Sequence, residues 1–163
     1  MVNQLDKYWD VSSWPQRYQY SSFDLNYILV NGKRPSREGK HWTKRDVVDF
    51  MKWITKHSQS KGEMILYRGT WDSPVPYWNN DNSNVNHNLV STSISERIAK
   101  EFSNDGKGYV HILYLSPGCK TFDMKRYYTS GVRREKEILL FPGHQFTFLK
   151  KYGHRYHWLV TSL

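Results

Sequence analysis

With 163 residues, 38% of them hydrophobic and 16% aromatic, the chain is long enough for one domain with a real core, which excludes a disordered protein. A net charge of +9 is compatible with binding to nucleic acid, to an acidic protein surface or to an anionic cofactor, and it does not distinguish among these partners. The only cysteine, Cys119, excludes a disulfide framework and a cysteine-based zinc site. No apolar run reaches the ~20 residues of a membrane span, and no signal peptide is visible, so we expect a cytoplasmic protein.

The first sixty residues favour helices. Residues 21–33 (SSFDLNYILVNGK) are typical of a short helix capped by Ser21 or Ser22. A clearer helix is predicted over 44–57, with Thr43 as its cap. Its apolar residues recur at the spacing of one buried helical face: Val47, Phe50, Met51 and Ile54.

The rest of the chain favours strands. Residues 72–88 are rich in Asn, Asp, Ser and Pro and predict a long loop, and Ser95 caps a short helix over 96–102. This order predicts an α+β domain with a helical part, 1–60, and a β-rich part, 61–163. The expected strands lie at 64–69, 88–95, 108–116, 135–141, 144–152 and 155–163.

Two acidic residues precede an apolar run in the stretch VRREKEILLFPG, residues 132–143. On a strand, Glu135 and Glu137 point to the same face about 7 Å apart, and Lys136 points to the other. Neighbouring carboxylates repel each other, and the pKa of one or both rises unless a cation offsets the repulsion. The pair is therefore either a solvated strand end or a pair of chemical groups.

Two earlier segments carry further candidate residues. Arg68 ends a strand directly before Gly69, where backbone can approach a ligand, and a guanidinium suits bidentate contact with phosphate oxygens. The hydroxyl run Ser91-Thr92-Ser93 leads into a helix. Taken singly, Arg68 can be an ordinary surface arginine, and the hydroxyl run can be an ordinary transition from a strand to a helix cap.

Taken together and in this order, the three motifs resemble the mono-ADP-ribosyltransferase family of the arginine-serine-glutamate class. That family includes catalytic components of binary toxins and host-modifying transferases of tailed phages. Its pattern is an arginine on a strand, a Ser-Thr-Ser strand and Glu-x-Glu. The match extends to an asparagine three residues before the first serine, Asn88, and a phenylalanine eleven after it, Phe102. It covers residues 60–150 well, and the first sixty only through a faint echo at Tyr20, Phe23 and Asn26.

The resemblance implies a fold in which N-terminal helices pack on a strand-rich core of two sheets with an NAD cleft. NAD is the implied co-substrate, and no metal is implied. Glu137 would stabilise the ribosyl cation, Ser91 would hold Glu137 by a hydrogen bond, and Arg68 would bind the phosphate side of NAD. The implied cofactor-binding residues are Arg68, Gly69, Asn88, Ser91, Thr92, Ser93, Phe102 and Glu137.

The resemblance also implies an acceptor. Members with Glu at the position of Glu135 tend to modify arginine, because a carboxylate there can bind the guanidinium and accept a proton. Tyr127 and Tyr128 fall where the family has a substrate-recognition loop, with plain hydrophobic packing as the alternative. The expected partners are NAD and a target protein with an accessible arginine, acidic or associated with nucleic acid. We expect a monomer that does not bind a membrane. It would act in a cytoplasm, and the cytoplasm of a host cell is one of the options.

Other interpretations stay open on the sequence alone. An NAD glycohydrolase would use the same Glu137 with water as the acceptor. A basic, aromatic-rich module that binds nucleic acid by stacking and phosphate contacts would leave both glutamates incidental. A poly-type transferase fits less well, because those usually carry a histidine where Arg68 stands.

Overall fold

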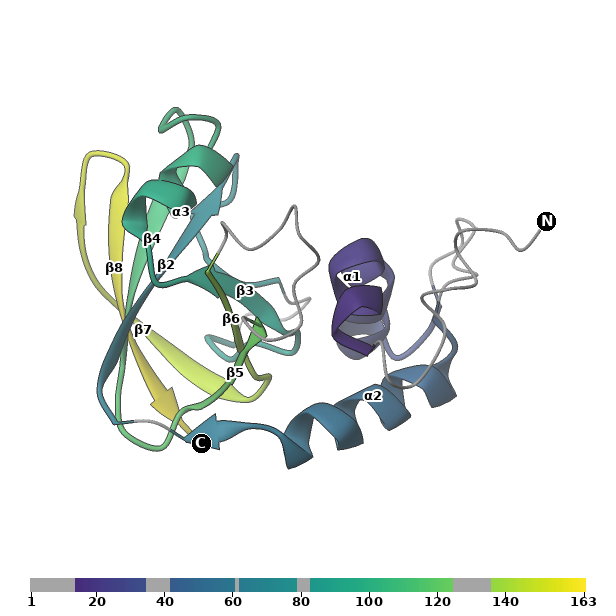
Figure 1. The fold of residues 1–163 in the computed structure, drawn as a ribbon. Helices are drawn as coiled ribbons and strands as arrows, with labels where there is room; N and C mark the ends of the chain where they lie inside the picture. Colours follow the sequence, from purple (N-terminus) through teal and green to yellow (C-terminus); the bar gives the residue numbers. More distant parts are fainter. Residues whose placement is uncertain (1–13, 35–41, 61, 79–82, 125–135) are drawn as a thin grey trace.

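A computed structural model gives the fold of the protein and describes residues 14–34, 42–60, 62–78, 83–124 and 136–163. No helix in these ranges is long and apolar enough to cross a membrane. The predicted α+β class is confirmed (Figure 1). In chain order the elements are α1 (Trp14–Asn31), α2 (Lys44–Lys56), β1 (Gln59–Ser60), β2 (Met64–Thr70), β3 (Val90–Ser93), α3 (Glu96–Phe102), β4 (Tyr109–Leu115), β5 (Lys120–Asp123), β6 (Glu137–Leu140), β7 (His144–Tyr152) and β8 (Arg155–Ser162).

The strands form one eight-stranded sheet in the order β1-β5-β6-β3-β2-β4-β8-β7. We expected two sheets. The two halves are continuous because β2 pairs with β3 on one side and with β4 on the other. Every pair is antiparallel except β4 with β8. In Figure 1 the β5, β6 and β3 half lies toward α1 and α2, and the other half carries α3.

The two N-terminal helices differ from the sequence prediction in one respect. Thr43 caps α2 as predicted: its hydroxyl accepts from the Asp46 amide at 3.1 Å, and the Asp46 carboxylate accepts from the Thr43 amide at 2.9 Å. The first helix, α1, begins at Trp14 and not near Ser21. Ser21 instead has non-helical φ and ψ of −142° and 42°, which marks a kink inside α1. The predicted cap therefore corresponds to a kink.

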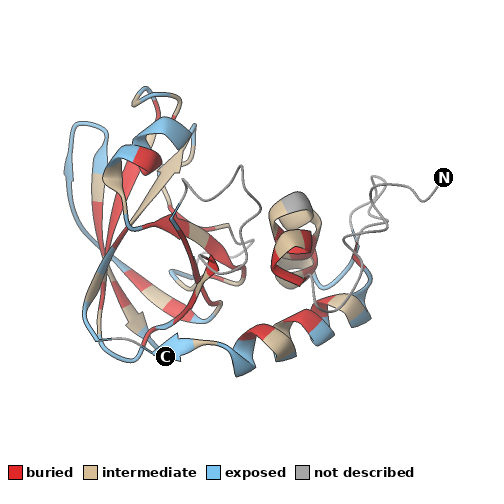
Figure 2. Cartoon of the chain, in the orientation of Figure 1, coloured by how far each residue is buried: buried red, intermediate tan, exposed pale blue. Residues whose placement is uncertain are grey.

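Two large apolar clusters and a small one under α3 hold the fold together, and Figure 2 shows the buried positions along the chain. One packs α1 and α2 against the β5–β6 half of the sheet, and it includes Tyr18, Phe50 and Leu139. The other fills the inside of the curved sheet, and it includes Leu113 and Trp158. Because the first cluster fixes α1 against the sheet, it also determines which α1 side chains face β3 and β6.

The strand predicted over 135–141 is shorter in the structure. It begins at Glu137, because Lys136 has a φ of 46°, in the left-handed region that strands do not use. The predicted strand therefore does not extend through Lys136. Glu135, which was predicted to share a face with Glu137, lies outside the described residues. Strands β1 and β5 were not predicted at all.

Candidate active site

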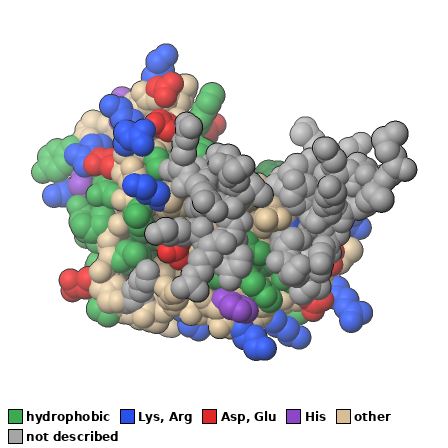
Figure 3. Space-filling view, in the orientation of Figure 1, with side chains coloured by type: hydrophobic (Ala, Val, Ile, Leu, Met, Phe, Trp, Pro, Cys, Tyr) green, Lys and Arg blue, Asp and Glu red, His purple; other side chains and the backbone are tan. Residues whose placement is uncertain are grey.

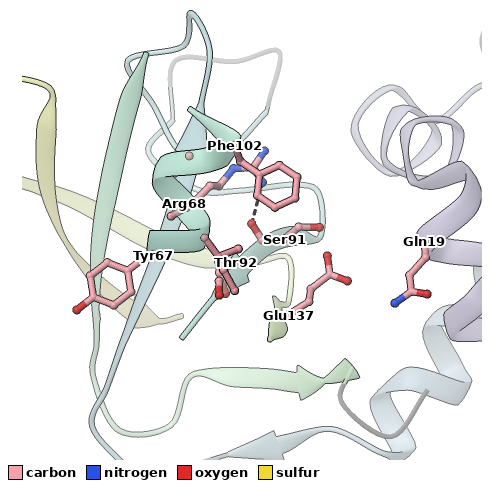
Figure 4. Close-up of a pocket in the computed structure, with 11 residues that line it drawn as sticks. Gln19, Tyr67, Arg68, Ser91, Thr92, Phe102 and Glu137 are labelled. Atoms are coloured by element: carbon pink, nitrogen blue, oxygen red, sulfur yellow. Dashed lines mark hydrogen bonds between the residues drawn. The ribbon is translucent and has the colours of Figure 1, made fainter. Parts of the chain in front are cut away.

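A cavity of about 370 Å³ opens where β2, β3 and β6 meet α1 and α3 (Figure 4). Seven of the eight predicted cofactor-binding residues line it. Asn88 is not among its lining residues. The lining residues are Gln19, Tyr67, Arg68, Gly69, Ser91, Thr92, Ser93, Ile98, Ala99, Phe102 and Glu137.

The order of the strands brings the three sequence motifs together. The arginine strand β2, the hydroxyl strand β3 and the glutamate strand β6 are consecutive in the sheet. Ser93 stands opposite Tyr67 of β2 on one side and opposite Glu137 of β6 on the other. Residues that are 69 positions apart in sequence, Arg68 and Glu137, thus come to one site.

Arg68 reaches across β3. Its Nη1 donates to the Ser91 carbonyl oxygen at 2.8 Å, which is the bond drawn in Figure 4. Burial lowers the pKa of Arg68, and the charges of Tyr18 and Glu137 act against that decrease. The side chain stays a cation, because arginine does not deprotonate in proteins. Its Nε is buried and has no hydrogen-bond partner within the described part of the chain. A partly buried cation with a donor that no described residue uses favours an anionic ligand.

Glu137 is the first residue of β6 and is 8% exposed. In Figure 4 its carboxylate extends from the sheet toward α1, where Gln19 faces it across the opening. The acid therefore stands at the boundary of the helical and sheet halves, close enough to Arg68 for their charges to interact. A carboxylate in this position can act on a cation that forms in the cavity.

The structure adds a residue that the sequence analysis missed. The Tyr18 hydroxyl on α1 and the Ser91 Oγ are hydrogen-bonded at 3.0 Å. Burial raises the pKa of Tyr18 to about 12; the charge of Glu137 adds to the increase, and hydrogen bonds to Ser91 and Asn26 oppose it. The hydroxyl is thus neutral at ordinary pH. The sequence offered little signal for Tyr18, because it precedes the serine at which the first helix was expected to begin.

Gly69 and Ser93 line the cavity and also have a role in packing. A Cβ on Gly69 would lie 1.9 Å from the Ala99 carbonyl oxygen, so only glycine lets α3 approach β2 this closely. The Ser93 Oγ accepts from the Ser95 amide at 3.1 Å, just before α3 begins. Thr92 donates to the Ile138 carbonyl oxygen at 2.6 Å and ties β3 to β6. Phe102, 51% exposed, lies at the end of α3 over the cavity.

Asn88 has another environment. It is buried, its Oδ1 accepts from the Trp78 amide at 3.3 Å, and its Nδ2 donates to the Leu89 carbonyl oxygen at 3.1 Å. These bonds hold the loop before β3 in place. The other predicted residues, Tyr127, Tyr128 and Glu135, lie outside the described residues. Within the described ranges no group of three His, Cys, Asp or Glu side chains is placed to hold a metal ion.

Solved structures of mono-ADP-ribosyltransferases share this fold. Exoenzyme S from Pseudomonas aeruginosa, in complex with human 14-3-3 protein beta and bound to carba-NAD, has a TM-score of 0.59 at 15% identity. That match covers 91% of this chain and 71% of Exoenzyme S. The ADP-ribosylating toxin BECa of a C. perfringens binary enterotoxin, with NADH, has a TM-score of 0.59 at 14% identity. It covers 90% of this chain, which spans only 42% of BECa.

A third example is Vis, an ADP-ribosyltransferase toxin from Vibrio splendidus, in complex with agmatine. Its TM-score is 0.54 at 12% identity, over 95% of this chain and 76% of Vis. No protein-family model matches the sequence, and no curated protein matches it. The similarity to these solved structures confirms the predicted fold class.

Proposed function

We propose that this protein is a mono-ADP-ribosyltransferase that transfers ADP-ribose from NAD to an arginine side chain of a target protein and releases nicotinamide. The observation that carries the proposal is that Arg68, Ser91 and Glu137 line one cavity. The fold around that cavity is shared with transferases solved with carba-NAD and NADH.

In the first step the bond between ribose C1′ and the nicotinamide nitrogen breaks. Its electron pair leaves with nicotinamide, whose ring nitrogen loses its positive charge, and the ribose gains oxocarbenium character. A fixed carboxylate beside that developing charge lowers the barrier, and Glu137 is the acid that the cavity offers. Losing one such preorganised group typically costs on the order of 10² to 10³ in rate.

Binding of NAD falls to residues around the glutamate. Arg68, a partly buried cation with a spare Nε donor, suits the diphosphate. Phe102 presents an exposed ring that suits packing against nicotinamide. Ser91 would orient Glu137, and the hydrogen bond between Tyr18 and Ser91 would fix the Ser91 hydroxyl in turn.

The second step needs a nucleophile. A guanidine nitrogen of the acceptor attacks C1′ and gives up a proton, for which Glu135 is the proposed base. The charged guanidinium is a poor nucleophile, so a carboxylate that binds it and removes the proton has a clear chemical purpose. The Vis toxin has been solved with agmatine, a small guanidine, which supports a guanidine acceptor for a protein of this fold. The target would be a protein of a host cell, as for a toxin or phage effector.

The test is incubation of the protein with labelled NAD and an excess of agmatine. We expect nicotinamide release and labelled ADP-ribosyl-agmatine, and a decrease of about 10² to 10³ in rate for Glu137→Gln. Glu63→Gln makes the same charge change at an exposed residue outside the cavity and should keep the wild-type rate. Undiminished cleavage by Glu137→Gln would refute the mechanism. Free ADP-ribose as the only labelled product would refute the transfer and indicate a glycohydrolase.

A further inference from the structure

Among the residues that the structure describes, none beyond α3 covers most of one face of the sheet. The short helix α3 packs over Gly69, Val110 and Ile112 at one end of this face. Outside the part under α3 the face carries exposed side chains: Ile65 of β2 is 48% exposed, and Tyr152 of the edge strand β7 is 66% exposed. We call this surface, made by Ile65, Tyr67, Tyr114, Lys150 and Tyr152 around the buried His157, the open face.

The strand register shows that these side chains share one face. Ile65 stands opposite Tyr114, and two residues further along Tyr67 stands opposite Ile112. Ile112 is opposite His157, and His157 is opposite Lys150 of β7. Directly opposed residues point to the same side of a sheet. The open face thus runs across β2, β4, β8 and β7, and its β2 end, Tyr67, also lines the candidate active site.

Ring contacts join the middle of the open face into one row. Tyr114 and His157 stack with ring centroids 5.8 Å apart, and the Tyr114 hydroxyl and His157 Nδ1 are hydrogen-bonded at 2.9 Å. Tyr152 meets His157 edge to face at 6.2 Å, and Lys150 Nζ lies 5.4 Å from the Tyr152 ring centroid. The result is a fixed aromatic row that ends in a cation and a largely exposed ring.

The charge of this region is one-sided. Residues 138–163 contain no Asp or Glu, whereas they contain Lys150, Lys151 and Arg155. The acid that approaches from α3, Glu96, is paired with Arg155 at 2.6 Å. Glu63 lies beyond Ile65, at the far end of β2 from Lys150. Figure 3 shows apolar side chains beside Lys, Arg and His side chains over the β7–β8 hairpin. The partner that fits is an anion with surfaces for stacking.

The edge of the sheet argues against a peptide strand as that partner. Strand β7 is the last strand of the sheet, and it contains a register shift between Phe148 and Lys150. Bulges and lysines on an edge strand are devices that prevent a further strand from pairing. Binding on this side is therefore a matter of side chains on the face.

We propose that the open face binds single-stranded nucleic acid, with a base stacked on the exposed ring of Tyr152 and phosphates held by Lys150. Proteins that bind single strands combine a row of aromatic side chains with cations that follow the backbone. The site goes beyond the proposed transferase reaction and does not depend on it.

The test is fluorescence anisotropy with labelled oligo-dT and oligo-U of 20 nucleotides, over a range of salt concentrations. Tyr152→Ala should weaken binding about tenfold, the size of one lost stack, and Tyr152→Phe should keep wild-type affinity. Lys150→Ala should reduce the slope of log K against log salt by about 0.7, the value for one phosphate contact on a single strand.

The chain supplies a matched control for the lysine. Lys151 is the next residue of the same strand, has the same charge, and lies 5.2 Å from the Tyr156 ring centroid on the opposite face. Lys151→Ala should therefore leave the salt slope nearly unchanged. All of these variants should keep the wild-type rate of NAD cleavage, so the outcome is separate from that of the proposed function.

Three results would overturn the proposal. Equal affinity of Tyr152→Ala and wild type would exclude stacking on this ring. An equal loss for Lys150→Ala and Lys151→Ala would indicate attraction by net charge alone. Displacement of the oligonucleotide by poly-glutamate of the same charge, at the same concentration, would indicate an acidic protein as the partner instead.

Discussion

The hydrogen bond between Tyr18 and Ser91 offers a sharp test of how α1 contributes to the site. In Tyr18→Phe the ring stays, with its stacking on Phe50 at 6.0 Å, and the hydroxyl alone is removed. No cavity is created, so the loss of stability is that of the hydroxyl's hydrogen bonds to Ser91 and Asn26, about 0.5 to 1.5 kcal/mol each. Ser91 is only partly buried, and water can replace the lost partner, so we expect the lower end of that range.

The effect on rate follows from the role proposed for Ser91. If the Tyr18 hydroxyl fixes the Ser91 side chain, and Ser91 orients Glu137, the variant should lose about tenfold in kcat, which corresponds to about 1.4 kcal/mol. KM for NAD should change little. Because the pKa of Tyr18 is raised to about 12, its hydroxyl is neutral from pH 6 to 9, and the loss should be the same throughout that range.

The assay is a double-mutant cycle on nicotinamide release, with Tyr18→Phe, Ser91→Ala and the double variant, alongside urea unfolding of each. Residues that act through one contact give non-additive effects, so the double variant should be little worse than Ser91→Ala. Purely additive losses in kcat would refute the reasoning. A loss confined to stability, with kcat unchanged, would leave Tyr18 as a packing residue only.

Three further predictions follow from single contacts. Gly69→Ala should lower the free energy of unfolding by about 3 kcal/mol or more, because the added Cβ would lie 1.9 Å from a backbone oxygen of α3. Gly62→Ala is the control, since open space surrounds Gly62, and it should not lower the free energy of unfolding. Urea unfolding measures both variants. Burial, with a smaller effect of the Arg68 charge, lowers the pKa of His111 from 6.5 to about 4. The unfolded chain then binds a proton that the native protein does not, so stability should fall by about 3 kcal/mol as pH drops from 6.5 to 4, and His111→Gln should flatten that decrease. Arg68→Lys should raise KM for NAD about tenfold in steady-state assays, because a single ammonium replaces the guanidinium fork.

Helices with caps were predictable from the sequence because their signals are local. Thr43 and Ser95 both cap helices in the structure, and α3 has the predicted bounds. The long strands β4 and β7 were equally clear from their apolar and aromatic residues. Such signals lie within a few residues of each other, so no tertiary contact is needed to read them.

The missed strands depend on pairing instead. Strand β5 has only four residues, and its register with β6, in which Phe122 stands opposite Leu139, exists only after the chain has folded. The two residues of β1 pair in the same way with β5. The single continuous sheet has the same origin, since β2 joins both halves through partners far away in the sequence.

The residues of the candidate site also fall into two groups, those with a local sequence signal and those that only the folded structure brings to the site. Arg68, Ser91 and Glu137 were found because each sits in a short motif whose order along the chain carries the information, and the sheet then makes their strands neighbours. Tyr18 and Gln19 have no motif. They reach the site because the apolar face of α1 packs beside β5 and β6, which turns these side chains toward β3 and Glu137. A helix placed by its hydrophobic core thus completes a polar site. For that reason the N-terminal helices, where the sequence resemblance is weakest, are the part of the chain in which variation should change the reaction without touching any of its motifs.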